Sequence, residues 1–334
     1  MTLTCRRMLS LTAVTVTALA LPGTAAAQTA SAGSGQAYPN RPLRFIVPFA
    51  PGAPPDIIAR IVGNKLIEQI GQQVIVDTRP GASGVIAAEI AKNALPDGYT
   101  LLLAGSTLFA ALPALKPKLP YDPDHDFVAL SRVATAAQVV AVHPSLGVGT
   151  VADLVKLAKA RPGQINYGSA GNGSTSHLGG EMFNVLADVK TVHVPYKSSS
   201  LALNDLIAGQ IQFMIVSPPT VMSQAKAGRI KLIATTGATR DPLLPELPPV
   251  ADAVPGFEIE QWWGIAAPAK TPAAVVKKLH TEIVKVLQSP DVRELLAKQG
   301  ATAHAESPAE FAAFIKVERS RIARVGRQVG ITLD

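Results

Sequence analysis

The chain has 334 residues, of which 48% are apolar and 16% charged, and its formal net charge is +7. Its apolar content is too high, and its charge too low, for an intrinsically disordered protein. A single cysteine excludes a disulfide scaffold and a cysteine-based zinc site. The length predicts two domains, each large enough to bury a core.

The N-terminal segment has the features of a secretory signal peptide. Two arginines precede an apolar run at residues 8–21, and small residues follow up to Ala27. The run is too short for the roughly 20 residues of a membrane-spanning helix. We therefore expect that a signal peptide at residues 1–27 is cleaved off after about Ala27 and that the mature protein is exported to the periplasm. Residues 28–37 are expected to form a flexible leader.

Strands and helices alternate in the first part of the mature sequence. Buried strands are predicted at 43–47, 74–76 and 99–103, and helices at 56–70 and 84–94. This order favours a parallel sheet with helices on its faces.

A linker rich in proline and polar residues is predicted at 106–129. Within it, residues 122–126 are expected to form a surface turn. A calcium-binding EF-hand is excluded because Phe127 and Val133 stand where that loop needs glycine and glutamate.

A second α/β unit follows the linker. Its strands are predicted at 139–142, 165–167, 192–194, 211–216 and 230–234, with helices at 151–160, 177–186 and 201–208. Thr150 and Asp153 form a capping box at the start of the first helix. The C-terminal part is predicted to contain a strand at 262–267, an amphipathic helix at 272–287 and a last helix from a capping box at Ser307 to about Val325.

The usual signatures of catalysis and of metal or nucleotide binding are missing from the sequence. None of the six histidines pairs with another at metal-ligand spacing, and no serine lies in a G-x-S-x-G motif. There is no Walker A motif and no strict G-x-G-x-x-G. The positive charge is spread along the chain, whereas nucleic-acid binding needs a concentrated basic stripe. We therefore predict no catalytic residue, no metal site, no cofactor and no nucleic-acid partner.

Four strand-to-helix loops rich in small residues are the best candidates for a binding site. They lie at residues 48–56, 79–84, 168–176 and 196–200. Small residues let a ligand approach backbone N–H groups, and helix N-termini carry partial positive charge, so such loops suit a carboxylate or phosphate in a crevice. Each loop alone is also explained by ordinary turn chemistry, but four together favour anion binding.

Short motifs follow one another in order along the chain, at and around these loops. They lie at residues 38–49 (YPNRPLRFIVPF), 79–84 (RPGASG), 96–101 (PDGYTL), 121–123 with 126–127 (YDP and DF), 167–171 (YGSAG), 194–197 (VPYK) and 263–268 (WGIAAP). Together they resemble the Bug-type solute-binding proteins, which are the extracytoplasmic receptors of tripartite tricarboxylate transporters. The resemblance covers residues 38–334.

The resemblance implies an α/β fold of the type II periplasmic-binding-protein class, with two lobes joined by crossover strands and a ligand cleft between them. Lobe one would comprise residues 38–138 and 262–334, and lobe two residues 139–261. The family binds small carboxylates through backbone amides, hydroxyls and bridging waters, without a metal. The implied partners are a small organic anion and the membrane subunits of a transporter or a sensor kinase, with the receptor itself a monomer.

The resemblance also implies which residues contact the ligand. The candidates in lobe one are Phe49, Ala50, Gly52, Ala53, Pro55, Gly81, Ala82, Ser83, Gly84 and Ser106. The candidates in lobe two are Ser169, Asn172, Ser174, Thr175, His177, Tyr196, Lys197 and Ser198. Ser174 and Thr175 are expected to donate to one ligand carboxylate, the alternative for either being a helix N-cap.

The sequence departs from the family pattern at positions that bear on ligand identity. Ala53 and Pro55 replace a glycine and a threonine of the first loop, Ser198 replaces a glycine, and Gln212 and Val216 replace aspartates. Proline removes a backbone donor and stiffens its loop. These departures are compatible with a pocket that binds an unusual ligand.

Three functions are compatible with these residues. Capture of a carboxylate for uptake is favoured, and a periplasmic sensor that presents its ligand to a membrane partner would have the same fold and pocket. A secreted hydrolase that uses Lys197, Ser174 or His177 is the third.

Overall fold

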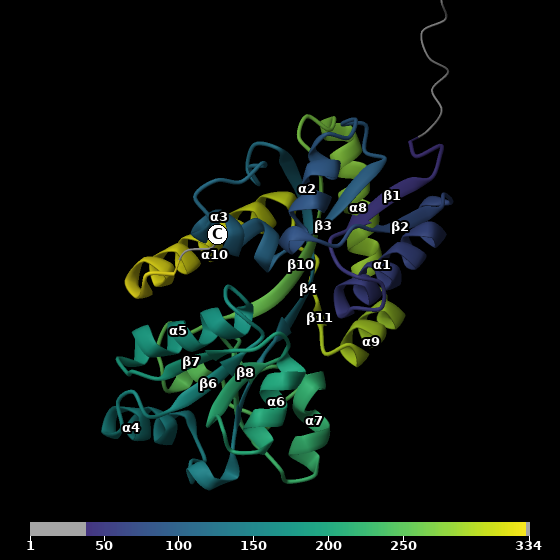
Figure 1. Ribbon diagram of the computed structural model, residues 1–334. Coiled ribbons are helices and arrows are strands. Elements are labelled where there is room, and N and C mark those ends of the chain that lie inside the picture. Colours follow the sequence, from purple (N-terminus) through teal and green to yellow (C-terminus); the bar gives the residue numbers. More distant parts are fainter. Residues whose placement is uncertain (1–37, 332–334) are drawn as a thin grey trace, which may run out of the picture. The chain divides into compact units, whose positions relative to one another are not determined.

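The computed structural model describes residues 38–331, which form two β-sheets flanked by helices (Figure 1). The expected signal peptide (1–27) and leader (28–37) lie outside the described residues. The six-stranded sheet contains β1 (Leu43–Val47), β2 (Val74–Thr78), β3 (Thr100–Gly105), β4 (Phe127–Ala137), β10 (Glu260–Pro268) and β11 (Thr302–Ala303). Its strand order is β11-β4-β10-β3-β1-β2. The predicted α/β class with two lobes is confirmed.

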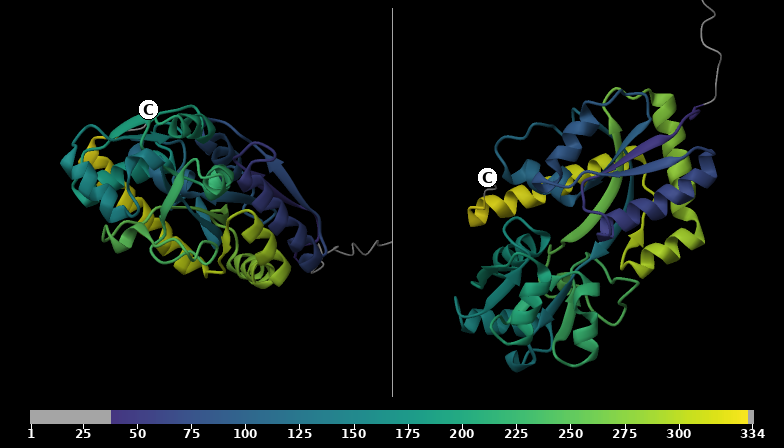
Figure 2. Two further views of the ribbon diagram at one scale, coloured as in Figure 1. Left: turned by 90° about the horizontal axis from the view of Figure 1, so that it is seen from below. Right: turned by 45° about the vertical axis from the view of Figure 1, so that its right-hand side comes forward.

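Helices cover both faces of the six-stranded sheet (Figure 2). They are α1 (Pro54–Ile70), α2 (Val85–Lys92), α3 (Leu112–Leu115), α8 (Ala273–Gln288), α9 (Pro290–Lys298) and α10 (Pro308–Val329). Phe45 of β1 belongs to one buried cluster with α1 and α8, whereas the next residue, Ile46, belongs to another with α2 and α10. Successive side chains of a strand point to opposite faces, so a run of apolar residues in β1 serves two layers of helices.

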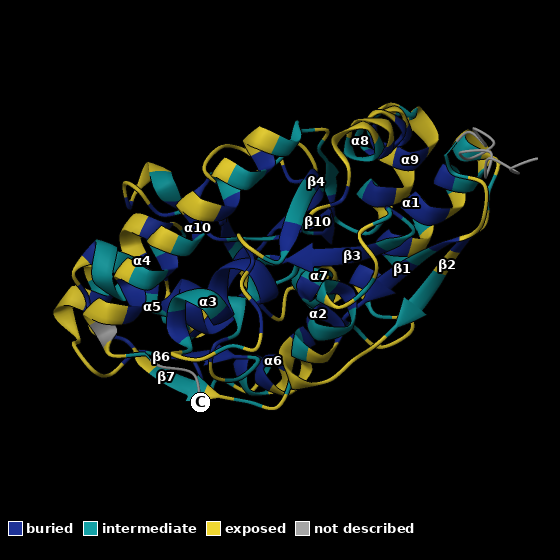
Figure 3. Ribbon diagram, turned by 90° about the horizontal axis from the view of Figure 1, so that it is seen from above, coloured by how far each residue is buried: buried dark blue, intermediate teal, exposed yellow. Residues whose placement is uncertain are grey.

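The five-stranded sheet contains β5 (Val139–Val142), β6 (Asn166–Ser169), β7 (Val192–Pro195), β8 (Phe213–Val216) and β9 (Lys231–Thr235). Its strand order is β7-β6-β8-β5-β9. Apolar residues of α4 (Val151–Ala160) and α5 (Thr175–Ala187) cover one face, and those of α6 (Ser199–Ile207) and α7 (Pro218–Lys226) cover the other. The inner strands β3, β5, β8 and β10 are almost fully buried, whereas the edge strands β2 and β7 are partly exposed (Figure 3).

Two segments of chain connect the sheets. Gln138 joins β4 to β5, and residues 236–259 lead back from β9 to β10. The backbone N–H of Gln138 donates to Thr236 Oγ1 (2.8 Å), and the N–H of Thr236 donates to the carbonyl of Gln138 (2.9 Å), so the two segments are tied together. We keep 138/139 and 261/262 as the proposed lobe boundaries.

The strand directions follow from these connections. β1, β2 and β3 are parallel, as the β-α-β-α-β order predicts, and so are β6, β7 and β8. β10 runs antiparallel to β3 and β4, and β5 runs antiparallel to β8 and β9. Each sheet is therefore mixed, because the strands next to a crossing run against the βαβ units.

The predicted linker at 106–129 is wrong in its first half. A π-helix at Thr107–Ala111 continues into α3, and Leu108 and Phe109 are fully buried.

α7 and α9 were not predicted either. All three α-helices have proline in the first two positions, where its missing N–H costs nothing. Proline marks a helix start here, and not a break.

Candidate functional site

A cavity of about 260 Å³ lies where the parallel strands β1, β2 and β3 end. Because the carboxyl ends of parallel strands meet at one edge of a sheet, the loops that follow them converge there. The lining residues are Pro48, Phe49, Gly81, Ser83, Gly84, Gly105, Ser106, Thr107, Leu108, Gln261 and Trp263. Five of the predicted site residues, Phe49, Gly81, Ser83, Gly84 and Ser106, are thus brought together.

The loop between β2 and α2 has an unusual backbone at this cavity. Ala82 and Ser83 have φ of 46° and 55°, which is the left-handed region, and they lie between two glycines with positive φ. Such a conformation costs a non-glycine residue on the order of 1–3 kcal/mol and is concentrated at ligand-binding sites. A Cβ on Gly84 would lie 3.0 Å from Pro48 Cβ, so glycine lets this turn approach the loop after β1. Ala82 itself does not line the cavity.

Six lining residues are not among the predicted site residues: Pro48, Gly105, Thr107, Leu108, Gln261 and Trp263. Trp263 and Gln261 come from β10, which pairs with β3 through Trp263 and Gly105, and Thr107 begins the π-helix. Trp263 is 4% exposed, and Leu108 and Phe49 give the cavity further apolar surface. The motif at 263–268 contains the signal that could have found Trp263, because it belongs to the family pattern.

Most of the first loop does not reach the cavity. Of its predicted residues only Phe49 lines it, whereas Ala50, Gly52, Ala53 and Pro55 do not. The N–H of Gly52 donates to Asp56 Oδ2 (2.8 Å), which also forms an ion pair with Arg60 (3.0 Å). The N–H of Gly52 and the guanidinium of Arg60 therefore bind the buried carboxylate of Asp56, which is 2% exposed, and not a ligand anion.

The loop between β6 and α5 in the second lobe is held by its own hydrogen bonds. Ser174 is the N-cap of α5, since its Oγ accepts from the N–H of His177 (3.3 Å) and donates to the carbonyl of Gly171 (2.7 Å). Of the two alternatives for Ser174, the structure shows the cap. Thr175, in contrast, lines a second small cavity together with Gly173, and Ser106 and Thr107 line both cavities.

Two histidine rings are stacked beneath this loop. The centroids of His177 and His193 are 4.0 Å apart with an interplanar angle of 22°, and Tyr167 stacks on His193 at 5.0 Å. His177 Nδ1 accepts from the N–H of Gly173 (3.1 Å), and His193 Nε2 lies 2.7 Å from Ser169 Oγ. Burial lowers the pKa of both rings, and for His193, which also faces His177, the pKa falls to about 4. The neutral pair supports the loop through Gly173 and Ser169.

The remaining predicted residues of the second lobe lie apart from both cavities. Tyr196 donates from its hydroxyl to Asp205 Oδ2 (2.6 Å), and Ser198 is the N-cap of α6. Asn172 and Lys197 are exposed and line neither cavity.

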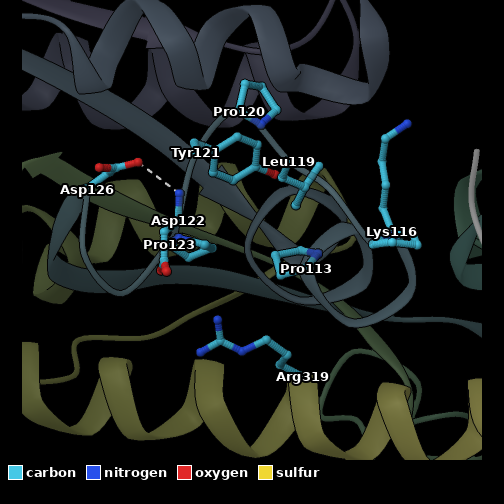
Figure 4. Close-up of a pocket in the computed structure, with 10 residues that line it drawn as sticks. Pro113, Lys116, Leu119, Pro120, Tyr121, Asp122, Pro123, Asp126 and Arg319 are labelled. Atoms are coloured by element: carbon cyan, nitrogen blue, oxygen red, sulfur yellow. Dashed lines mark hydrogen bonds between the residues drawn. The ribbon is translucent and has the colours of Figure 1, made fainter.

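A larger hollow of about 490 Å³ lies between residues 113–126 and α10 (Figure 4). Arg319 lines it and binds Asp124 with two hydrogen bonds (2.7 and 2.8 Å), and the N–H of Asp122 donates to Asp126 Oδ2 (2.8 Å). These bonds form the predicted surface turn at 122–126. Arg319 and Asp126 are engaged in these bonds and no predicted site residue lines this hollow, so the cavity at β1–β3 is the better candidate.

Residues 38–331 contain neither a metal-binding cluster nor a membrane-spanning helix. Among them, no three or more histidine, cysteine, aspartate or glutamate side chains are grouped so that they could hold a metal ion. Nor does this part of the chain contain a helix of the length and apolarity needed to cross a membrane.

Comparison with known proteins identifies the family of this chain. Residues 58–331 match the family model described as the tripartite tricarboxylate transporter family receptor. BugT of Bordetella pertussis is 34% identical over 302 residues, which cover 90% of this chain and 93% of BugT. The structure of Rpa4515 of R. palustris with adipate is 34% identical with a TM-score of 0.75, covering 89% and 99% of the two chains.

A further solved structure is MatC of Rhodopseudomonas palustris with bound malate. It is 29% identical with a TM-score of 0.70, covering 86% of this chain and 99% of MatC. The Bug-type resemblance predicted from the motifs is confirmed, and this chain belongs to the receptor family of the tripartite tricarboxylate transporters.

Proposed function

We propose that the protein is a periplasmic receptor that captures a small carboxylate and delivers it to the membrane subunits of a tripartite tricarboxylate transporter. The observation that carries the proposal is the cavity at the carboxyl edge of β1–β3, which is lined by backbone, hydroxyl and amide groups. Two relatives with this fold have adipate and malate bound. We further propose that the protein acts as a monomer, after removal of residues 1–27.

Neutral donors would hold the carboxylate in this proposal. The hydroxyls of Ser83, Ser106 and Thr107 and the amide of Gln261 line the cavity, next to the strained turn that starts α2. Hydrogen bonds to a charged group are about twice as strong as those between neutral groups, so a few such donors suffice for one carboxylate. Thr175 faces the same region from the second lobe, because its small cavity shares Ser106 and Thr107.

The geometry of the candidate nucleophiles supports binding and not catalysis. The Ser174 hydroxyl donates to the carbonyl of Gly171, and His177 Nδ1 accepts a backbone N–H from Gly173. A nucleophile needs a base within hydrogen-bond reach of its hydroxyl, and here both groups are engaged with the backbone of their own loop. We therefore propose that Ser174 and His177 do not act as the nucleophile and base of a hydrolase.

A thermal-shift screen tests the proposed function directly. We expect at least one small carboxylate to raise the melting temperature, since a ligand at a hundredfold excess over its Kd stabilises the folded state by about 2.7 kcal/mol. The shift should be the same with and without EDTA, because no metal takes part. The amide of the same acid is the matched control and should give no shift. If no carboxylate raises the melting temperature, or if EDTA abolishes the effect, the proposal is wrong.

Ser174 and Thr175 should separate stability from binding. Ser174→Ala is expected to lower the free energy of unfolding by about 1 kcal/mol through loss of the N-cap, with little change in carboxylate affinity. Thr175→Val keeps the shape of the side chain but removes the hydroxyl, and is expected to weaken carboxylate binding roughly tenfold with unchanged stability. Urea unfolding and calorimetric titration measure the two effects. If Thr175→Val leaves the affinity unchanged, the second lobe does not bind through this hydroxyl.

A further inference from the structure

A histidine takes part in the N-terminal cap of α5. Ser174 accepts from the N–H of His177, and the His177 ring reaches back to accept from the N–H of Gly173 (3.1 Å). In a capping box, the third helical residue returns a bond from a carboxylate or an amide. Asp153 of α4 and Glu310 of α10 do so with a carboxylate. In α5 the residue at this position is an imidazole, which gains a proton near neutral pH when it is unperturbed.

The bond to Gly173 exists only while the His177 ring is neutral. A backbone N–H can only donate, so Nδ1 must carry a lone pair and the ring proton must be on Nε2. A proton on Nδ1 would bring two N–H groups together and break the bond. Since Gly173 is buried, its N–H would then lack a partner unless the loop moved. A cationic ring in the first turn of a helix is also opposed by the helix dipole.

His193 lies against His177 and supports the other end of the same turn. The centroids of the two rings are 4.0 Å apart. Nε2 of His193 lies 2.7 Å from Ser169 Oγ, which accepts from the N–H of Gly171 (3.0 Å). Burial lowers the pKa of both rings, and the His177 ring acts in the same direction on His193. The pair is therefore neutral at neutral pH, with the turn at 171–173 held at both ends.

The elements packed around His177 bring one unscreened carboxyl group toward it. Glu181, on α5 itself, favours the protonated form of the His177 ring and accepts from the Tyr167 hydroxyl of β6 (2.6 Å). β8 contributes only apolar residues, and α10 faces α5 with Glu318, which is paired with Arg321. The effect of Glu181 opposes that of burial, so the ring is able to bind a proton in acid while the protein is folded.

We propose that His177 is a positioning residue that holds the loop at 171–175 in its carboxylate-binding conformation while its ring is neutral, and releases the loop when the ring binds a proton. The inference rests on the proposed receptor function, in which Thr175 faces the ligand from the second lobe. Gly173 and Thr175 line one small cavity beside the candidate site, so release of Gly173 displaces the Thr175 hydroxyl. The receptor would bind a carboxylate at neutral pH and release it in acid.

The first test observes the loop without any ligand. NMR follows the Cε1–H of His177 and the protection of the Gly173 N–H against hydrogen exchange, relative to an unfolded chain at the same pH. Between pH 7.5 and 4.5 this protection should fall about tenfold, as the His177 ring binds a proton.

Two variants make the exchange measurement specific. His177→Asn places a carbonyl oxygen at the position of Nδ1, so it accepts the same N–H but cannot be protonated, and the protection should be equal at both pH values. His143→Asn is the matched control, because His143 Nδ1 also accepts a backbone N–H, from Ser145 in a surface turn (3.2 Å). This control should lose protection of Gly173 as the wild type does.

The second test is calorimetric titration at the same two pH values. The probe is adipate or, if adipate does not bind, the carboxylate with the largest shift in the thermal-shift screen. Because the probe itself takes up protons in acid, the measured quantity is the ratio of wild-type to His177→Asn affinity. This ratio should be near one at pH 7.5 and fall about threefold or more at pH 4.5. His177→Phe keeps a ring but has no acceptor, and should bind weakly at both pH values.

The outcomes separate this inference from the receptor function. Unchanged protection of Gly173 in the wild type, or equal losses in the wild type and in His177→Asn, would overturn the role of His177 and leave the carboxylate receptor intact. Loss of protection with an unchanged affinity ratio would show that the loop does not control binding, and would also overturn the inference. If no carboxylate binds at either pH, the proposed function fails and the inference fails with it, even where the exchange measurement shows that His177 holds the loop.

Discussion

Replacing Phe311 by alanine is expected to lower the free energy of unfolding by about 3–5 kcal/mol. Phe311 is fully buried in α10, and its ring packs edge-on against Trp262 with the centroids 5.6 Å apart. It also fills the space above Gly264 in the middle of β10, where a Cβ would lie only 2.1 Å from Phe311 Cζ. Truncation would leave a cavity between α10 and β10 of the six-stranded sheet.

Urea unfolding measures this loss, and Val317→Ala is the matched control. Val317 lies on the same helix but is 65% exposed, so its truncation should change stability by no more than about 0.5 kcal/mol. Equal losses for the two variants would show that α10 does not pack on β10 as described.

Acidification is expected to destabilise the protein through His193. In the unfolded chain this histidine binds a proton near pH 6.5, whereas in the folded chain burial and the neighbouring His177 lower its pKa to about 4. His193 is neutral in both the folded and the unfolded chain above pH 6.5, so its contribution to the free energy of unfolding is complete there. That contribution is lost as the pH falls from 6.5 toward 4. Because the ring is partly exposed and solvent screens its charge, we expect a loss of about 1–2 kcal/mol between pH 7.5 and 4.5.

Urea unfolding at these two pH values, in wild type and His193→Gln, tests the assignment. The variant should lose less stability on acidification, because glutamine has no proton to bind. Some pH dependence should persist, since burial and Arg132 also lower the pKa of His304 to about 4. His143→Gln, a change in a partly exposed surface turn, should keep the wild-type pH dependence. A His193→Gln profile identical to that of the wild type would contradict the prediction.

Local pattern alone was enough for the elements that depend on near neighbours in the sequence. The strand at 43–47 and the capping boxes at Thr150 and Ser307 appear as predicted. The parallel order of β1, β2 and β3 also follows from the sequence, because βαβ connections permit little else. Ordered motifs along the chain predicted the family, and with it the two-lobed fold.

The composition of the site was decided by tertiary structure. Gln261 and Trp263 reach the cavity because β10 pairs with β3, more than 150 residues earlier in the chain, and such long-range pairing leaves no local pattern. The sequence also could not show that the N–H of Gly52 donates to the Asp56 carboxylate. Nor could it show that Ser174 caps α5 while Thr175 lines a cavity. A hydroxyl or an N–H has the same local preferences whether its partner is its own loop or a ligand, and only the folded chain determines which partner is within reach.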